Sequence, residues 1–261
     1  MAMIVLIAEA KSMGTAEMAV DAQTFAAHRP AFEVQADGIM DSLRDHSIDQ
    51  LSSEVGITTR LATSLQRMIY EFPNKSLGLQ AIRAFTGVVF RQLALVDYDN
   101  AQWSFLADNV RIVSSLYGWL RPDDFIKPYR FDFKSRVAPG GESLMKFWKK
   151  DVTIALVKEL QARCATEIID LLPSDAAKCV DWKVVKRFAK VYKVDFKTVR
   201  DSGELKTPNS GRLKELRGRL LDMMIREGIS SAEEVSRLES ADFMPNSEDA
   251  GISPTLSFIT A

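Results

Sequence analysis

Apolar residues follow two spacings along this chain, and each spacing predicts one kind of element. Continuous or alternating apolar runs predict strands or extended segments, at residues 3–9, 110–113, 128–133, 167–172 and 188–196. Apolar residues that recur every three or four positions predict helices, at residues 15–28, 32–46, 48–55, 58–69, 76–84, 98–109, 142–163, 209–227 and 231–238. This mixture predicts an α/β protein in which many helices cover one mixed sheet.

Neither a repeat nor a long linker divides the sequence, so we expect a single compact domain over residues 1–245. Residues 246–261 form a polar tail that turns apolar near its end. We expect residues 256–259 to add a last edge strand to the sheet.

One pair of predicted helices surrounds a glycine. Ser47 can cap the first helix, and the turn Val55-Gly56-Ile57 separates it from a second helix that Thr58 can cap. A glycine between two helices with apolar faces resembles a helix–hairpin–helix element, and we expect one here.

Composition restricts the chemistry. The chain has two cysteines without C-x-x-C spacing and two histidines without a ligand pattern, which argues against a zinc site or a histidine-based catalytic triad. Acid–base chemistry would then fall to carboxylates, tyrosine or lysine. The apolar runs are shorter than the roughly 20 residues that span a bilayer, and no secretory signal is visible. We expect a cytoplasmic protein without a membrane partner; the sequence identifies no cofactor.

The formal net charge of −1 conceals an uneven distribution. Residues 110–150 carry nine basic against four acidic side chains, and residues 183–219 carry twelve against four. Residues 1–60 and 220–261 are acidic. The two basic blocks either form one positive face for a phosphate-bearing ligand or simply alternate in sign on soluble helix surfaces.

Candidate functional side chains are densest in residues 114–133, directly after a predicted strand. Arg121 and Arg130 are planar donors suited to a carboxylate or a phosphate. Asp124, Asp132 and Tyr129 are the acid–base candidates of this segment. The same residues could instead form an arginine–aspartate network that fixes an irregular loop.

The ordered motifs of this chain resemble the YaaA family of bacterial peroxide-stress proteins. Residues 114–124 and 128–130 are similar to the family's Leu-Ser-x-Leu-Tyr-Gly-x-Leu-Arg-Pro-x-Asp turn and its Pro-Tyr-Arg. The resemblance covers roughly residues 1–245, and further matches in order are Lys11, Arg60-Leu61-Ala62, Ala84-Phe85-Thr86-Gly87, Phe147-Trp148, and Lys214 with Arg217-Gly218.

This resemblance implies a compact α/β fold with a positively charged cleft, affinity for double-stranded DNA and a role in limiting peroxide damage. The chain departs from the family pattern at Ala8 and Glu9, where the family has Ser-Pro, and at Val88, Phe90 and residues 173–176. Several polar groups of the implied cleft are thereby changed, which suggests an altered ligand.

Two functions compete, and a purely structural or adaptor role is a third. A DNA-binding stress protein would contact phosphates with basic side chains. An enzyme of specialised metabolism would hold a small anionic or nucleotide-like substrate in the same cleft. Across both hypotheses, the candidate binding residues are Lys11, Arg60, Tyr117, Arg121, Lys127, Tyr129, Arg130, Lys214 and Arg217.

We expect Lys11, Arg121, Tyr129 and Arg130 to converge on one concave site, because the strands before them should end at one rim of the sheet. An enclosed pocket would favour the enzyme, and a long open groove would favour DNA.

Overall fold

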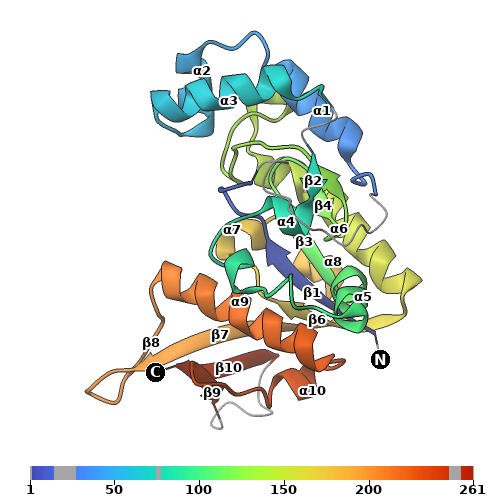
Figure 1. Ribbon diagram of the computed structural model, residues 1–261, viewed down its shortest axis with the longest axis vertical. Coiled ribbons are helices and arrows are strands. Elements are labelled where there is room, and N and C mark those ends of the chain that lie inside the picture. The colour runs from blue at the N-terminus through green and yellow to red at the C-terminus, as the bar shows by residue number, and fades with distance from the viewer. Residues whose placement is uncertain (1, 15–27, 75–77, 247–253, 261) are drawn as a thin grey trace.

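The computed structural model describes residues 2–14, 28–74, 78–246 and 254–260. The helix expected at residues 15–28 therefore lies outside the described residues, apart from its last position. Figure 1 shows the order and arrangement of the elements.

An eight-stranded mixed sheet forms the centre of the protein, in the order β4-β3-β1-β6-β7-β10-β9, with β8 paired to β7. The strands from β3 to β10 in this order run parallel, whereas β4, β8 and β9 are antiparallel to their neighbours. The strands are β1 (Ala2–Ala8), β3 (Val110–Ser114), β4 (Gly118–Leu120), β6 (Ala165–Asp170), β7 (Lys190–Val199), β8 (Leu205–Lys206), β9 (Phe243–Pro245) and β10 (Thr255–Thr260). A separate two-stranded sheet pairs β2 (Leu79–Gln80) with β5 (Phe125–Ile126).

Helices cover both faces of the central sheet. Residues 3–7 of β1 are all buried, as expected for a parallel strand with layers on either side. The helices are α1 (Glu33–Ser42), α2 (Ile48–Val55), α3 (Thr59–Glu71), α4 (Ala81–Ala84), α5 (Asn100–Asn109), α6 (Leu144–Ala162), α7 (Ser174–Ala177), α8 (Trp182–Val185), α9 (Ser210–Glu227) and α10 (Ala232–Val235). Two 3-10 helices, η3 (Phe90–Gln92) and η4 (Pro139–Gly141), complete the described elements.

The layers follow from the connections between the parallel strands. The crossover from β1 to β3 contains α5, and the crossover from β3 to β6, in the opposite direction along the sheet, contains α6. Right-handed crossovers in opposite directions place their helices on opposite faces. Accordingly, α5 and α6 lie on opposite faces, with α8 in contact with α6 (Figure 1). α9 contacts α5 on the other face, a position that the rule does not explain, because the crossover from β7 to β10 runs in the same direction as that from β3 to β6.

The helix pair α2–α3 lies at one end of the molecule (Figure 1). Ser47 forms the predicted capping box with Gln50, and Gly56 adopts the left-handed conformation, φ 73°, that ends α2. The pair joins the body through the loop after residue 133, where the Arg136 amide donates to the Glu54 carbonyl over 2.8 Å. The structure thus shows two helices joined by a turn, and their action as a helix–hairpin–helix element stays a prediction.

Two expected strands differ from the structure. β10 pairs with both β7 and β9, so the last segment is an inner strand and β9 is the edge. Residues 128–133 form no strand, although Tyr129, Phe131 and Phe133 are buried in the predicted alternation. Within the described residues, no helix has both the length and the apolar composition needed to cross a membrane.

Candidate functional site

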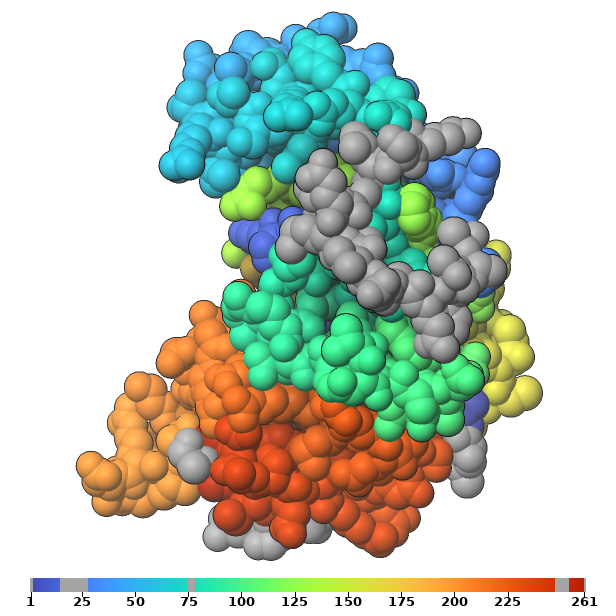
Figure 2. All heavy atoms as spheres, viewed as in Figure 1, coloured from blue at the N-terminus to red at the C-terminus, as the bar shows by residue number. Residues whose placement is uncertain are grey.

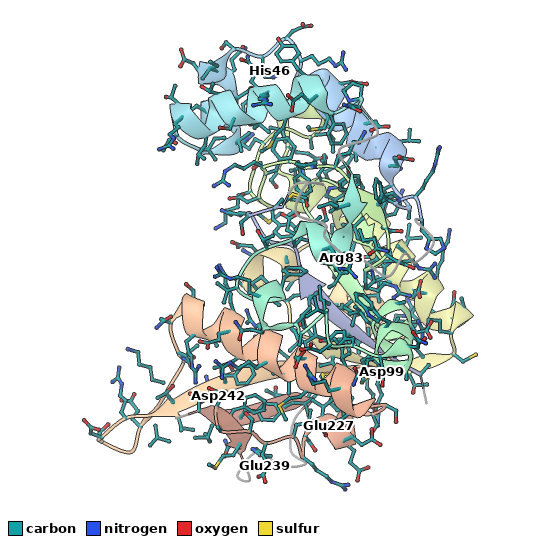
Figure 3. The ribbon with its side chains drawn as sticks, in the orientation of Figure 1. His46, Arg83, Asp99, Glu227, Glu239 and Asp242 are labelled. Atoms are coloured by element: carbon teal, nitrogen blue, oxygen red, sulfur yellow. The ribbon has the colours of Figure 1, made fainter. Side chains whose placement is uncertain are left out.

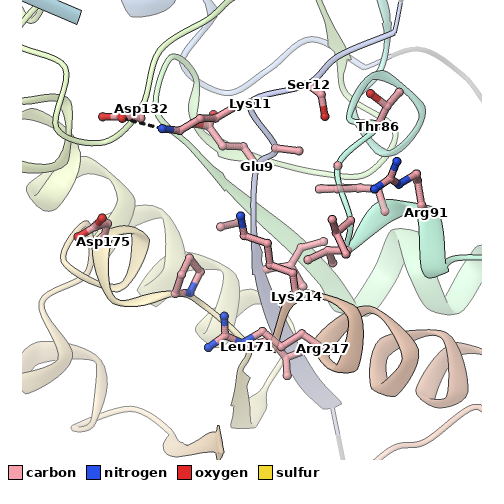
Figure 4. Close-up of a pocket in the computed structure, with 18 of the residues that line it drawn as sticks. Glu9, Lys11, Ser12, Thr86, Arg91, Asp132, Leu171, Asp175, Lys214 and Arg217 are labelled. Atoms are coloured by element: carbon pink, nitrogen blue, oxygen red, sulfur yellow. Dashed lines mark hydrogen bonds and ion pairs between the residues drawn. The ribbon is translucent and has the colours of Figure 1, made fainter. Parts of the chain in front are cut away.

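The parallel strands β1, β3 and β6 end at one rim of the sheet, because Ala8 pairs with Val113 and Leu6 pairs with Asp170. A cavity of about 520 Å³ opens above this rim. Its walls come from the residues after β1, from residues 86–91, from residues 130–133 and from α9 (Figure 4). The carboxyl ends of parallel strands are a common place for ligand sites in α/β proteins.

Glu9, the first residue after β1, lines this cavity. Its Oε2 accepts a hydrogen bond from the Ser115 amide at 2.8 Å and another from the Tyr129 hydroxyl. Burial raises the pKa of Glu9 to about 7, and the hydrogen bonds from Ser115 and Tyr129 oppose this rise only in part. Glu9 can therefore exchange a proton near neutral pH.

A directed chain of hydrogen bonds holds Tyr129 against Glu9. The Tyr117 amide donates to Ser114 Oγ at 3.0 Å, and Ser114 Oγ lies 2.8 Å from the Tyr129 hydroxyl. Because Tyr129 donates its only hydroxyl proton to Glu9, Ser114 must donate to Tyr129. The chain fixes the position of the phenol, and burial together with the Glu9 charge raises the pKa of Tyr129 well above its usual value.

Trp148 of α6 supports the turn that supplies these groups. Its indole Nε1 donates to the Ser115 carbonyl at 2.7 Å, and its side chain is fully buried. Gly118 has a positive φ of 66°, and a Cβ there would lie 2.6 Å from Trp148 Cε3. Glycine is therefore required for the chain to turn into β4 against this ring.

Lys11 and Arg130 lie together at the mouth of the cavity. Lys11 forms an ion pair with Asp132 at 2.9 Å, drawn in Figure 4, and Arg130 donates to the Lys11 carbonyl at 3.2 Å. Burial alone would raise the pKa of Asp132, but hydrogen bonds from Lys11 and the Lys134 amide lower it overall. Lys11 and Arg130 thus line one cavity, whereas Tyr129 is buried behind it and contacts Glu9. The binding roles expected of these residues stay predictions.

Basic side chains from other elements line the same cavity. Arg91 comes from η3, and Lys214 and Arg217 come from α9 (Figure 4). Like Arg130, they make no ion pair within 4.0 Å to any carboxylate of the described residues. Burial lowers the pKa of Arg217, while the charges of Asp170 and Asp195 oppose this shift.

The other arginines of α9 form ion pairs with aspartates, unlike Lys214 and Arg217, which face the cavity. Arg212 and Arg219 both form ion pairs with Asp242, the first at 3.0 Å, and Figure 3 labels this aspartate beside α9. Arg226 pairs with Asp222 at 2.8 Å. The basic block predicted at 183–219 therefore contains both balanced surface cations and cations that face the cavity.

Four predicted binding residues lie away from this cavity. β4 runs antiparallel to β3, with Leu120 opposite Ile112. Arg121 therefore lies beside Arg111, near the amino end of β3 and away from the rim at its carboxyl end. Tyr117 is buried and its hydroxyl accepts from the Lys127 amide at 3.1 Å. Arg60 is exposed on α3.

Lys127 belongs to a second cavity of about 460 Å³. Its Nζ lies 3.9 Å from the Phe72 ring centroid and 3.6 Å from Asp37 Oδ1. Asp124 is also placed elsewhere: its carboxylate accepts from the Arg121 amide at 2.8 Å, and burial raises its pKa to about 6. Of the two aspartate candidates, only Asp132 lines the first cavity.

Sequence reasoning missed Glu9 and Arg91 as site residues. Glu9 stood out only as a departure from a family motif, yet an acid directly after a buried strand is a recognisable signal of a residue at a sheet rim. Val88 and Phe90, where the chain departs from the family pattern, also line the cavity. Residues 86–91 therefore add apolar side chains to a cavity that Lys214 and Arg217 line with basic ones. No cluster of three or more metal-ligating side chains occurs within the described parts of the chain.

The fold and this cavity define a mixed α/β protein with a pocket, lined by charged and apolar side chains, at the ends of its parallel strands. A family model described as peroxide stress protein YaaA matches residues 3–249. A UPF0246 protein of Parabacteroides distasonis is 30% identical over 234 residues, which cover 88% of this chain and 89% of the relative. UPF0246 proteins of Porphyromonas gingivalis (29% over 206 residues; 78% and 79% covered) and Crocosphaera subtropica (31% over 179 residues; 68% and 70%) are also similar. The chain belongs to the family of peroxide stress protein YaaA.

Proposed function

We propose that this chain binds a small anionic, nucleotide-like molecule in the pocket above β1, and acts on it as an enzyme. The observation that carries the proposal is a set of pocket cations that form no ion pair with any carboxylate of the described residues: Arg91, Arg130, Lys214 and Arg217. The cavity volume of about 520 Å³ falls within the usual range for small-molecule sites, about 300–1,000 Å³.

Two buried atoms support this interpretation. Arg130 Nε and Arg217 Nε are inaccessible to solvent and have no hydrogen-bond partner among the described residues. A buried donor without a partner costs about 1–3 kcal/mol, and more on a charged group. An anion in the pocket could accept these two donors, although Arg44, Arg111 and Arg219 carry a similar buried Nε outside the pocket.

The test compares Arg130→Lys with Arg121→Lys. Lysine keeps the charge but loses the planar fork of arginine, so a two-point contact with an anion becomes a single mobile one. We expect Arg130→Lys to weaken pyrophosphate binding about tenfold and to reduce survival under hydrogen peroxide in cells that depend on this protein. Arg121→Lys, which lies outside the pocket, should change neither, and calorimetry with melting curves on both variants provides the measurement.

Equal pyrophosphate affinity in the wild type and Arg130→Lys would contradict the proposal. A lower melting temperature with unchanged binding would instead assign Arg130 to the stability of the loop. A loss of binding in Arg121→Lys alone would place the anion site at the end of β4.

A second candidate function is binding to the phosphates of double-stranded DNA, as the family resemblance implies. Figure 2 shows the outline hollowed between the α2–α3 pair and α9, with the residues after β1 (dark blue) at its base. Lys11 and Lys214 are exposed there. We expect any such binding to be weak, sequence-independent and salt-sensitive. Each cation removed should reduce the slope of log affinity against log salt by about one, and tight binding to one sequence at physiological salt in a mobility-shift titration would contradict this.

A further inference from the structure

Among the described residues, Glu9 is the acidic side chain of the pocket that forms no ion pair with a lysine or arginine. The other two acids that line it are engaged: Asp132 pairs with Lys11 at 2.9 Å, and Asp175 pairs with Lys134 at 3.0 Å. Glu9 makes no ion pair within 4.0 Å to a lysine or arginine of the described residues. A carboxyl group thus faces the same space as the cations to which we assign the anion.

We propose that Glu9 is the general acid of this pocket: its carboxyl takes up a proton when the anionic group of a substrate enters, and donates that proton to a neighbouring substrate oxygen. This inference rests on the proposed function, since it requires an anion to bind beside Glu9. The expected substrate is an anionic molecule whose carbonyl or leaving-group oxygen lies within hydrogen-bond reach of Glu9.

The geometry of the carboxyl group supports this assignment. The Ser115 amide and the Tyr129 hydroxyl both donate to Oε2, and the nearby Ser115 and Ser114 hydroxyls also lower the pKa of Glu9. The other oxygen, Oε1, is therefore the one on which a proton can sit without losing either contact. The rigid turn anchored by Trp148 and the Ser114–Tyr129 hydrogen bond hold the group in this orientation.

Charge explains why the proton would be taken up on binding. The raised pKa of Glu9, about 7, leaves the free pocket with a mixture of both protonation states at neutral pH. A bound anion disfavours the carboxylate further, because two like charges in a site of reduced dielectric repel each other. The complex therefore contains the neutral acid, which is the form that can donate.

The proton transfer itself is balanced within the pocket. The O–H bond of Glu9 breaks, its electron pair stays on the carboxylate, and the proton forms a new bond to the substrate oxygen. The donors on Oε2 then stabilise the carboxylate that results, and the surrounding cations offset its charge. Tyr129 acts as a positioning residue, since it contacts Glu9 rather than the reacting oxygen.

Other groups near Glu9 respond differently to pH. Tyr129, from residues 128–133, has a pKa raised well above its usual value, and burial followed by the Glu9 charge raises the pKa of Cys179 to about 12. Hydrogen bonds hold the pKa of Asp132 low. Asp170, at the end of β6, is the other group that could take up the proton when an anion binds. Burial raises its pKa to about 6, and its charge acts on Arg217 of α9, which lines the pocket. The remaining charged neighbours are Lys11, Asp175 of α7, Arg91 of η3, Arg130, and Lys214 and Arg217 of α9.

Sulfate is a suitable probe because it keeps its double negative charge across the tested range, so any proton taken up must come to the protein. We expect wild-type protein to bind sulfate up to about tenfold more tightly at pH 6 than at pH 8, the limit for one group whose pKa is about 7. Calorimetry in two buffers of different ionisation enthalpy should show uptake of up to one proton per sulfate near pH 7.5. Affinity rises as pH falls because the neutral form of Glu9 is the one that binds.

Glu9→Gln is the decisive variant, since an amide oxygen can accept both Oε2 hydrogen bonds and the change removes a charge that burial disfavours. We expect it to bind sulfate at pH 8 at least as tightly as the wild type, with the proton uptake and the pH dependence lost. Tyr129→Phe should move the midpoint of the wild-type pH profile upward, because the carboxylate loses a donor. A merely structural role of Tyr129 would leave the midpoint in place.

Asp170→Asn serves as the matched control and should keep the proton uptake. Equal uptake in the wild type and Glu9→Gln, or its loss in Asp170→Asn alone, would overturn the assignment of Glu9 while leaving anion binding intact. Absence of sulfate binding at every pH would instead overturn the proposed function, and the inference with it.

Discussion

Replacing Lys214 and Arg217 together with glutamine is expected to weaken pyrophosphate binding by at least about 100-fold. Both side chains line the pocket from α9 and lack ion pairs to described carboxylates. A hydrogen bond to a charged group contributes about 1.5–3 kcal/mol, and about 1.4 kcal/mol corresponds to a factor of ten in affinity. Two lost contacts therefore account for about two orders of magnitude, which calorimetry can measure directly.

The matched control removes two charges elsewhere. Lys183 and Lys186 are exposed on and after α8, and neither lines the pocket. Their double replacement by glutamine changes the net charge equally, so it separates local contacts from long-range attraction. Similar affinity losses in both double variants would show that overall charge, and not the pocket, determines binding.

Trp148→Ala is expected to lower the free energy of unfolding by about 3–5 kcal/mol, the usual cost of removing a fully buried large aromatic side chain. Trp148 packs against Phe32 and Phe147 at centroid distances of 5.4 and 4.8 Å and donates to the Ser115 carbonyl. Its loss also frees the turn that carries Ser114 and Ser115 to Glu9. Urea denaturation measures the stability, and the same protein should bind anions with altered pH dependence.

Trp148→Phe distinguishes packing from hydrogen bonding, because phenylalanine keeps much of the buried ring but cannot donate to Ser115. We expect a smaller loss than for Trp148→Ala, about 1–3 kcal/mol, from the smaller ring and the unsatisfied carbonyl. A Trp148→Ala protein as stable as the wild type would show that the turn is held by other contacts.

The sequence predicted those features that depend on short-range pattern. The buried strand at residues 3–9 appears as β1, and the capping box of α2 forms at Ser47. Lys11 and Arg130 were expected at one site, and they meet there because the chain returns to the end of β1 after residue 127. The mixed α/β class was also confirmed, because apolar alternation and helical spacing are local patterns that the folded protein retains.

Features that depend on register could not be predicted. Arg121 follows β4, and only the pairing of Leu120 with Ile112 shows that the hairpin carries it behind the rim. Apolar and polar side chains alternate along residues 128–133 as they would in a strand, but this segment pairs with no strand in the described part of the chain. Its buried side chains pack in the core instead, Tyr129 against the rings of Phe85 and Tyr117. The role of Glu9 emerged only when Ser115 and Tyr129, distant in sequence, were seen to contact one of its oxygens.

The central claim is that the pocket above β1 binds an anion, and a crystal structure of the protein soaked in selenate tests it most directly. Selenate has the shape and charge of sulfate, and its anomalous scattering identifies it without ambiguity. We expect a selenate ion in the pocket, within hydrogen-bond distance of Arg217 and of at least one of Arg130 and Lys214. A pocket without selenate, with the ion bound instead at α3 beside Arg60 or after β4 beside Arg121, would contradict the claim.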